Sequence, residues 1–266
     1  MPEERKKITI RKIIKKKNKE KIVMVTAYDY PTALIADRAG VDAILVGDSL
    51  AMVVLGMDST HGVTLNEMLH HIRAVARAKP KALVVGDMPF GSYEPSTSVA
   101  VESAIEMVRA GAEAVKLEGG SEYVDRIKGI VRAGIPVMGH VGMTPQRYLS
   151  FGGYKLRGKT PGEEKAILDD ALALEGAGAF SVVIEYTRPE LAKKITEKLS
   201  IPTICIGAGR HCDGQVLVFH DIVGLYPHSP PFAKKYADAF QYLLDALKRY
   251  AREVREGLFP GEEYTP

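Results

Sequence analysis

The sequence predicts an α/β fold, specifically a (β/α)8 or TIM barrel with an N-terminal capping helix. Short apolar runs rich in Val, Ile, Leu and Ala alternate with longer amphipathic segments along the chain. Runs of this kind are typical of parallel strands that are buried on both faces. Most of the runs end in a charged or polar residue, and the chain has 266 residues, close to the ~250 of a typical barrel.

The first expected element is an amphipathic helix over residues 8–19, which would close the base of the barrel. The expected strands follow at 21–28, 42–48, 82–87, 112–118, 134–140, 180–186, 201–209 and 220–226. The helices between and after them are expected at 32–40, 64–79, 98–111, 121–134, 162–178, 188–199 and 232–257.

Capping residues mark several helix boundaries. Thr64 and Glu67 fit a capping box at the start of one helix. Gly40, Gly111 and Gly134 each follow an Ala where a helix should end, and a left-handed cap suits glycine at that position. The recurrence of this glycine before the next strand indicates a repeated strand–helix unit.

A doubly wound sheet is the alternative architecture for such a pattern. The barrel is favoured because nearly every strand has a polar end, and only a closed ring directs so many of them to one point. No Pro/Gly/Ser-rich linker and no low-complexity segment divides the sequence. We therefore expect a single domain over residues 1–266.

Composition narrows the function classes. The net charge is only +3, so a nucleic-acid partner is not expected from charge. No apolar run reaches transmembrane length, and the basic start lacks the apolar core of a signal peptide. The two cysteines, Cys205 and Cys212, do not suggest a disulfide framework, and Cys205 is expected to be a packed strand residue. These features predict a cytoplasmic protein without membrane segments.

Two aspartates carry the strongest chemical signal. Asp48 and Asp87 both follow Val-Gly at the ends of consecutive strands. Either residue alone would be read as a cap of the next helix or turn. As a pair at one mouth of the sheet they favour a shared cation, because neighbouring carboxylates repel each other and a metal relieves the repulsion. Hard oxygen ligands favour Mg²⁺.

Lys116 and Glu118 form a second candidate pair. They stand two residues apart in AVKLE and therefore share one face of a strand, while Val115 and Leu117 share the other. The charged pair is expected to point into the barrel. One interpretation is a purely structural ion pair; the other places Glu118 near the metal and Lys116 on a substrate carboxylate.

His140 and Glu185 end two further strands. His140 is either a core histidine or a ligand contact. Glu185 lies at the end of an apolar run, a position that suits a general base; a salt bridge to Arg188 is the structural alternative. The Gly-rich, basic segment 141–162 is interpreted either as a mobile lid or as a solvated loop.

The motifs TAYDYPTALIADRAGVDAILVGDSLAMVVLG, THGVTLNEMLHH, GDMPFGSY, VKLEGG, GHVGMTPQ, GGYKLRGKT and IGAG with DGQVLVFHD carry a family resemblance. Over roughly residues 5–258, in order, the chain resembles the 3-methyl-2-oxobutanoate (ketopantoate) hydroxymethyltransferase family. The segment GAGRHCDGQ departs from the pattern at His211 and Cys212.

The resemblance implies a cytoplasmic, Mg²⁺-dependent barrel enzyme of pantothenate and coenzyme A biosynthesis. It implies transfer of a one-carbon unit from 5,10-methylenetetrahydrofolate, or a methanopterin analogue, to 2-oxoisovalerate. It also implies small-molecule substrates, neither nucleic acid nor membrane as a partner, and a homo-oligomer for which a decamer is the first expectation.

The resemblance assigns roles to the candidate residues. Asp48, Asp87 and Glu118 look like metal ligands. Glu185 resembles the proton acceptor, the catalytic base. The substrate-contact residues by resemblance are Asp48, Ser49, Asp87, Lys116 and His140.

Two other functions are considered. One is a Mg²⁺-dependent carbon–carbon lyase or mutase of the phosphoenolpyruvate mutase/isocitrate lyase superfamily, whose lyases use a catalytic Cys on a loop; neither Cys205 nor Cys212 lies in such a motif. The other is a non-catalytic oxo-acid-binding barrel, against which Glu185 argues, because binding alone needs no base. Exchange of the substrate C3 proton separates these possibilities.

Overall fold

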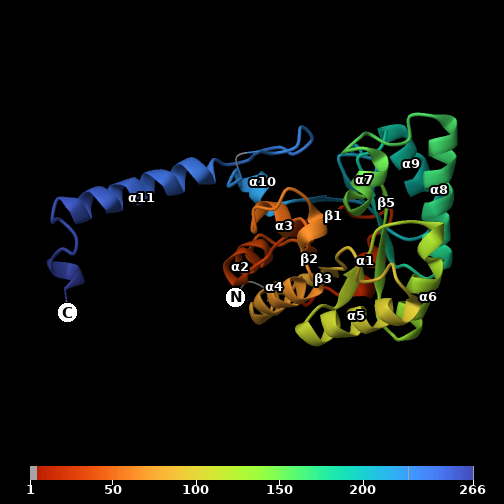
Figure 1. Cartoon of the computed structure of the whole chain (residues 1–266), viewed down its shortest axis with the longest axis horizontal. Helices are drawn as coiled ribbons and strands as arrows, with labels where there is room; N and C mark the ends of the chain where they lie inside the picture. Colours follow the sequence, from red (N-terminus) through yellow and green to blue (C-terminus); the bar gives the residue numbers. More distant parts are fainter. Residues whose placement is uncertain (1–4, 227, 266) are drawn as a thin grey trace. The chain divides into compact units, whose positions relative to one another are not determined.

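A closed barrel of eight parallel strands forms the centre of the structure, a computed structural model that describes residues 5–226 and 228–265 (Figure 1). Each strand pairs with the next in chain order, and β8 closes the ring on β1. The strands are β1 (Ile22–Thr26), β2 (Ala43–Val46), β3 (Leu83–Asp87), β4 (Ala114–Lys116), β5 (Val137–Gly142), β6 (Ser181–Glu185), β7 (Thr203–Ile206) and β8 (Gly214–Leu217). The predicted fold class is confirmed.

Helices cover the outside of this ring as the sequence predicts. The main ones are α2 (Tyr30–Arg38), α4 (Leu65–Arg77), α5 (Thr97–Ala110), α6 (Val124–Arg132), α8 (Pro161–Gly176) and α9 (Pro189–Lys198). Shorter pieces lie in the loops after the strands: α3 (Leu50–Val53), η1 (Thr60–Gly62), η2 (Ser121–Tyr123), η3 (Pro145–Arg147) and α7 (Tyr148–Phe151). The last two show that the segment 141–162 is partly helical.

The predicted caps are present. Thr64 accepts from the backbone N–H of Glu67 while the Glu67 carboxylate accepts from that of Thr64, so both members of the capping box are formed. Gly40, Gly111 and Gly134 have φ of 84°, 116° and 86°, the left-handed region that favours glycine.

The N-terminal helix α1 (Ile10–Lys15) closes the base of the barrel. Its Ile13 is 1 % exposed and belongs to the core cluster formed by inward-facing strand residues such as Ile22 and Leu83. Beyond the helix, Lys17 bonds the carboxylate of Asp213, just before β8, at 2.9 Å. The predicted capping helix is thus held in place by the apolar packing of Ile13, and the segment after it is held by the ion pair between Lys17 and Asp213.

The position of the eighth strand was predicted incorrectly. The sequence favours 220–226, but the strand is Gly214–Leu217, and α10 (Phe219–Val223) occupies most of the predicted segment. Only residues 207–213 separate β7 from β8, and they contain no helix. A strand–helix spacing like that of the other units was expected here. Because no helix separates these two strands, the sequence pattern placed the eighth strand too far along the chain.

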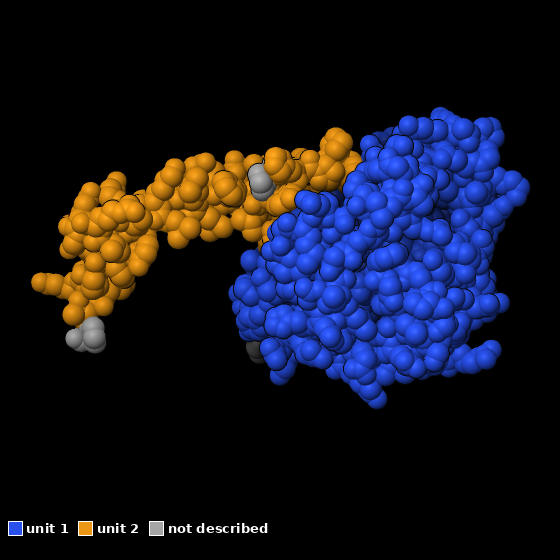
Figure 2. All heavy atoms as spheres, in the orientation of Figure 1, with its two compact units in different colours: residues 1–218 blue, residues 219–266 orange. Residues whose placement is uncertain are grey.

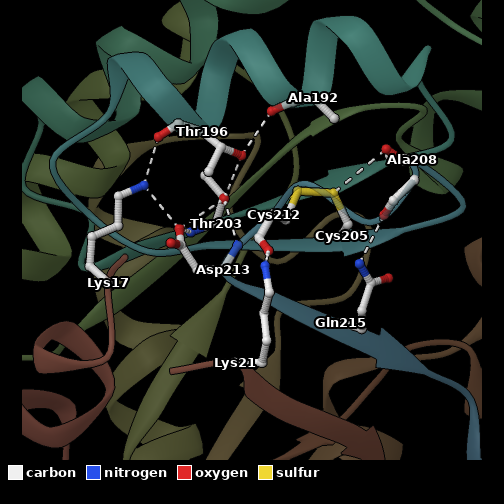
Figure 3. The surroundings of a disulfide bond; sticks show 11 residues. Lys17, Lys21, Ala192, Thr196, Thr203, Cys205, Ala208, Cys212, Asp213 and Gln215 are labelled. Carbon is white, nitrogen blue, oxygen red and sulfur yellow. Dashed lines mark hydrogen bonds and ion pairs between the residues drawn. A yellow bond between two sulfur atoms is a disulfide. The ribbon is translucent and has the colours of Figure 1, made fainter. Parts of the chain in front are cut away.

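The expectation that the two cysteines form no disulfide was also wrong, although Cys205 is a buried strand residue as expected. Cys205 on β7 and Cys212 before β8 form a disulfide with their Cα atoms 5.7 Å apart (Figure 3). Ile204 and Ile206 pack on the barrel core, so Cys205 between them points outward, where a helix covers the other strands. The disulfide thus lies beside the one connection that has no helix. Sequence spacing alone could not show that these two positions become neighbours.

Residues 219–266 form a second compact unit, distinct from the first, residues 1–218 (Figure 2). Within it, α11 (Ala239–Arg255) is shorter than the expected helix 232–257, because Asp238 caps its start through the N–H of Gln241; η4 (Glu262–Tyr264) follows. None of the helices among the described residues has the length and apolarity needed to cross a membrane. The single domain over residues 1–266 stays a prediction.

Reduction of the Cys205–Cys212 disulfide should lower stability, because the cross-link restricts the unfolded chain. For a sequence separation of 7, the chain-entropy model gives a loss of about 2–3 kcal/mol. Thermal unfolding with and without a phosphine reductant measures it, and Cys212→Ser should match the reduced wild type under both conditions. An unchanged midpoint after complete reduction, verified by thiol titration, would contradict this account.

Candidate active site

The predicted site residues come together at the carboxyl ends of five neighbouring strands. Asp48 follows β2, Asp87 ends β3, Lys116 ends β4 and Glu185 ends β6. Glu118 lies two residues beyond Lys116, and His140 lies in β5. Asp48, Asp87, Lys116, Glu118 and His140 are all buried. Parallel barrels build their active sites at this face.

Lys116 links two of the carboxylates. Its ammonium Nζ lies 2.7 Å from Oδ1 of Asp87 and 3.7 Å from Oε1 of Glu118. The backbone N–H of Asp48 donates to Oδ2 of Asp87 at 3.3 Å. The prediction that Lys116 and Glu118 share an inward face is confirmed, while Val115 and Leu117 are buried on the other face.

His140 stands between two glutamates. Its Nδ1 lies 3.5 Å from Oε1 of Glu118, and its Nε2 lies 3.4 Å from Oε2 of Glu185. The salt bridge considered between Glu185 and Arg188 is not the observed pairing, since Arg188 faces Glu190 at 3.6 Å. The side chain of Glu185 is 18 % exposed, compared with 1 % for Glu118. Glu185 is therefore the more accessible of the two carboxylates that flank His140.

Burial and crowding disfavour ionisation of both aspartates. Burial raises the pKa of Asp48 well above its usual value, and the charges of Asp87 and Glu118 raise it further. Burial likewise raises the pKa of Asp87, although Lys116 opposes the shift. Negative charge on this pair is thus unfavourable in the protein alone.

The pKa values of the two basic groups, Lys116 and His140, are raised, which favours their charged forms. Burial would lower the pKa of Lys116, but the surrounding carboxylates, Asp87 first, raise it. Burial and Lys116 lower the pKa of His140, whereas Glu118 and Glu185 raise it, to about 9 overall. Burial would raise the pKa of Glu118, yet His140 and Lys116 bring it below its usual value. The site therefore favours protonated His140 and Lys116 beside ionised Glu118.

Gln146 is a site residue to which the sequence analysis assigned no role. Its side-chain Nε2 donates to Oδ2 of Asp48 and to the carbonyl of Met88, each at 2.9 Å. Its backbone N–H donates to Oε2 of Glu118 at 3.0 Å. Gln146 ends the motif GHVGMTPQ, and its place in the segment 141–162 could have indicated an inward-facing amide. This part of the segment is a wall of the site.

Two hydroxyl groups complete the network. The Tyr93 hydroxyl donates to Oε1 of Gln146 at 2.6 Å and lies 3.0 Å from the carbonyl of Glu118. Ser49, next to Asp48, has its Oγ 2.8 Å from the hydroxyl of Tyr28. Tyr93 fixes the orientation of the Gln146 amide, so that the NH₂ group faces the carboxylate of Asp48.

The backbone around Glu185 is unusual. Tyr186, the next residue, has a φ of 44°, a left-handed conformation that is rare outside glycine. Gly142 on the adjacent strand has a φ of 98°, and a Cβ there would lie 2.3 Å from the carbonyl oxygen of Glu185. Both features accompany a sharp end to β6 and set the direction of the Glu185 side chain.

The donor set fits a cation held by two carboxylates. Within residues 5–226 and 228–265, no three His, Cys, Asp or Glu side chains form a group that could hold a metal ion by themselves. Both oxygens of Glu118 face donors, on Lys116, His140 and Gln146, and both oxygens of Asp87 face donors on Lys116 and on the backbone of Asp48. Asp48 and Asp87 repel each other and would be relieved by a cation, whose other ligands would come from substrate and water.

Gly207-Ala208-Gly209 forms the turn after β7. Gly207 and Gly209 have φ of 61° and 84°. The carbonyl of Gly209 accepts from Gln215 at 2.9 Å, and a Cβ on Gly209 would lie 2.8 Å from Pro189. The turn between β7 and β8 accounts for these glycines.

Comparisons with known proteins show the family of the chain. A family model described as ketopantoate hydroxymethyltransferase matches residues 7–262. The chain is 65 % identical over 260 residues to the 3-methyl-2-oxobutanoate hydroxymethyltransferase of Ignicoccus hospitalis, covering 97 % of this chain and 99 % of that protein. It is 61 % identical over 259 residues to the protein of the same name from Aeropyrum pernix, covering 97 % and 94 %.

Solved structures support the fold. A phosphonopyruvate hydrolase superposes with a TM-score of 0.62 at 14 % identity, covering 97 % of this chain and 91 % of its own. A 2,3-dimethylmalate lyase of the PEP mutase/isocitrate lyase superfamily gives 0.59 at 19 % identity, covering 97 % and 92 %. At such identities the likeness concerns the barrel and not the reaction.

Substitution of Asp48 by Asn should stabilise the metal-free protein. A carboxyl group whose pKa is raised by folding lowers stability at any pH high enough to ionise it in the unfolded chain. Asn retains an oxygen that can accept from Gln146. In EDTA at neutral pH, thermal unfolding of Asp48→Asn should therefore occur above that of the wild type.

Asp125→Asn, at an exposed position on α6, serves as the control and should leave the midpoint unchanged. The gain from Asp48→Asn should disappear below about pH 4, where the wild-type carboxyl group is also protonated. A lower midpoint for Asp48→Asn in EDTA at neutral pH would show that the pair is not under electrostatic strain.

Proposed function

This chain belongs to the ketopantoate hydroxymethyltransferase family, and on that premise we propose that it transfers a hydroxymethyl group to 2-oxoisovalerate, giving ketopantoate. Its family makes it an enzyme of the transferase class. The observation that carries the proposal is the convergence of a carboxylate pair, a buried lysine and an accessible glutamate at one barrel mouth. The proposed donor is 5,10-methylenetetrahydrofolate or a methanopterin analogue, in the cytoplasmic synthesis of pantothenate and coenzyme A.

Electrostatics supports the proposed Mg²⁺. The substrate is an anion, and the carboxylates of Asp48, Asp87, Glu118 and Glu185 outnumber the cations of Lys116 and protonated His140 that would attract it. Asp48 and Asp87 are the proposed principal metal holders, and Glu118 is proposed to lie at the metal with them. When bound, the metal would supply Lewis-acid stabilisation of negative charge on the 2-oxo group.

The other residues of the site have separate proposed roles in binding the oxo acid and in removing its proton. Lys116 and Ser49 would bind and orient the oxo acid, and Gln146 would hold Asp48 in place. Glu185 would remove the proton from C3, because it is the more exposed carboxylate beside His140. His140, 3.4 Å from Glu185, would position that carboxylate and stabilise its charge.

Carbon–carbon bond formation follows from proton removal. The C3 carbanion, delocalised onto the 2-oxo oxygen, attacks the methylene carbon of the carrier. Both carbon–nitrogen bonds of that methylene group break, and water supplies the hydroxyl group of the product. The proton taken from C3 and the second proton of the water end on the two nitrogens of the carrier. The alternative of a lyase with a catalytic thiol is disfavoured, because Cys205 and Cys212 are paired in a disulfide.

Asp87→Asn should weaken Mg²⁺ and oxo-acid binding together, because the proposed two-carboxylate site loses one ligand. Isothermal titration with Mg²⁺ in the presence of 2-oxoisovalerate measures both, with Asp125→Asn as the matched control. Full turnover of Asp87→Asn after treatment with a chelator would remove this metal assignment.

Glu185→Gln should keep the side-chain shape and metal binding while losing proton removal. General-base catalysis typically contributes about 10²- to 10⁴-fold, so kcat should fall far more than oxo-acid affinity. Proton NMR in D₂O, which follows loss of the C3 hydrogen of 2-oxoisovalerate, tests this step without the carrier.

Exchange at the wild-type rate in Glu185→Gln would move the base elsewhere, with His140 the next candidate. Loss of oxo-acid binding would instead make Glu185 a positioning residue. A wild type that binds 2-oxoisovalerate but never exchanges C3 would favour the non-catalytic binding barrel.

A homo-oligomer, with a decamer as the first expectation, is the proposed assembly. In its support, α11 has no buried residue and carries exposed Phe240, Leu243, Leu247 and Val254, an apolar content that suits association. Light scattering at micromolar concentration with Mg²⁺ present should give a mass of several chains. The mass of one chain, 29.0 kDa, would contradict the expectation.

A further inference from the structure

Four aromatic side chains form a row above the barrel mouth, here called the aromatic row: Phe90, His61, Tyr148 and Tyr154. They come from loops after three strands: His61 after β2, Phe90 after β3, and both tyrosines after β5. The His61 ring centroid lies 4.7 Å from that of Phe90 and 4.9 Å from that of Tyr148. Tyr148 and Tyr154 stack at 5.5 Å with their planes 6° apart. These are the spacings of favourable ring contacts.

The aromatic row is joined to the carboxylate site through one residue. His61 Nε2 lies 2.6 Å from the carbonyl oxygen of Gln146, whose side chain bonds Asp48 at 2.9 Å. At the far end of the row, burial raises the pKa of Tyr154 to about 12, and the charges of Glu185 and Asp48 contribute. The Tyr154 hydroxyl therefore lies within electrostatic range of the proposed base.

Both ends of the row face solvent. Phe90 is 49 % exposed and Tyr154 is 47 % exposed, although each makes ring contacts on one side. Exposed aromatic faces beside a polar site are a favourable place for a flat ring to stack. The barrel loops hold these rings in place before any ligand binds, which reduces the entropy cost of binding.

We propose that the aromatic row is the binding surface for the pterin ring of the one-carbon carrier. The inference rests on the proposed function, which needs two substrates of unlike chemistry. The oxo acid is small and anionic, which suits Lys116 and a metal. The carrier ends in a reduced pterin, whose pyrimidinone half is flat and aromatic and whose faces bind well to other aromatic rings. Tyr154, at one end of the row, interacts electrostatically with Glu185, so a ring stacked there would lie near the proposed base.

The test compares Phe90→Ala, Tyr154→Ala and Tyr154→Phe by isothermal titration with Mg²⁺ and 2-oxoisovalerate present. The probes are tetrahydrofolate and 6-methyltetrahydropterin, which lacks the benzoylglutamate tail. Each Ala variant should raise the Kd of both probes about ten- to a hundredfold, as expected for loss of one stacked ring. Tyr154→Phe keeps the ring and should bind both probes like the wild type.

Tyr242→Ala, at a tyrosine on α11 that is 72 % exposed against 47 % for Tyr154, is the control outside the row and should change neither Kd. The Kd of the oxo acid should change less than twofold in Phe90→Ala and Tyr154→Ala. Wild-type affinity for 6-methyltetrahydropterin in both Ala variants would overturn the assignment of the row to the pterin ring. A change in molecular mass by light scattering, without a change in pterin affinity, would overturn it in favour of contact with a second copy of the chain.

The two proposals fail in different ways. If the wild type forms ketopantoate from 5,10-methylenetetrahydrofolate but the Ala variants bind the pterin probes with unchanged Kd, the proposed function stands. In that case only the assignment of the aromatic row to the pterin ring is wrong. If the wild type neither exchanges the C3 hydrogen nor forms product, the proposed function is wrong. The assignment of the aromatic row, which rests on that function, is then wrong as well.

Discussion

The organisation of this site depends on a charge imbalance in a buried space. Lys116 is bonded to Asp87 at 2.7 Å, and Asp48 and Glu118 crowd the same space. Lys116 and protonated His140 do not neutralise three buried carboxylates and Glu185 beside them, and burial together with this excess of carboxylates raises the pKa values of Asp48 and Asp87. Such a cluster costs stability in the protein alone. The cluster becomes favourable when a further cation binds between the carboxylates, and the proposed catalysis depends on that bound cation.

The barrel makes this cluster possible. Five consecutive strands deliver six polar side chains to the same mouth, with Lys116 and Glu118 both coming from the end of β4, and the ring geometry leaves no wider spacing for them. At the base, Ile13 of α1 fills the opposite end with apolar contacts. Apolar packing at the base of the barrel therefore offsets the unfavourable burial of charge at the mouth. Conservative substitutions at the base should mainly change stability, whereas those at the mouth should also change activity.

Much of the fold and of the cluster could be predicted because both follow from local pattern. Apolar runs that end in Asp, Glu, Lys or His indicate strand ends, and alternation places Lys116 and Glu118 on one face. Gln146 could not be assigned in this way, because its role arises from a loop that folds back over the mouth. The eighth strand and the disulfide share a second cause: β7 and β8 are joined without a helix, so the expected spacing fails there.

The central claim is that Asp48 and Asp87 together hold a divalent cation that binds the oxo acid. The most direct measurement is a crystal structure with Mn²⁺ and 2-oxoisovalerate, with anomalous diffraction used to locate the metal. The account predicts one anomalous peak in coordination contact with a carboxylate oxygen of Asp48 and one of Asp87, and the oxo acid on its open side. A peak at another group of residues, or an oxo acid bound in this mouth with no metal at saturating Mn²⁺, would contradict it.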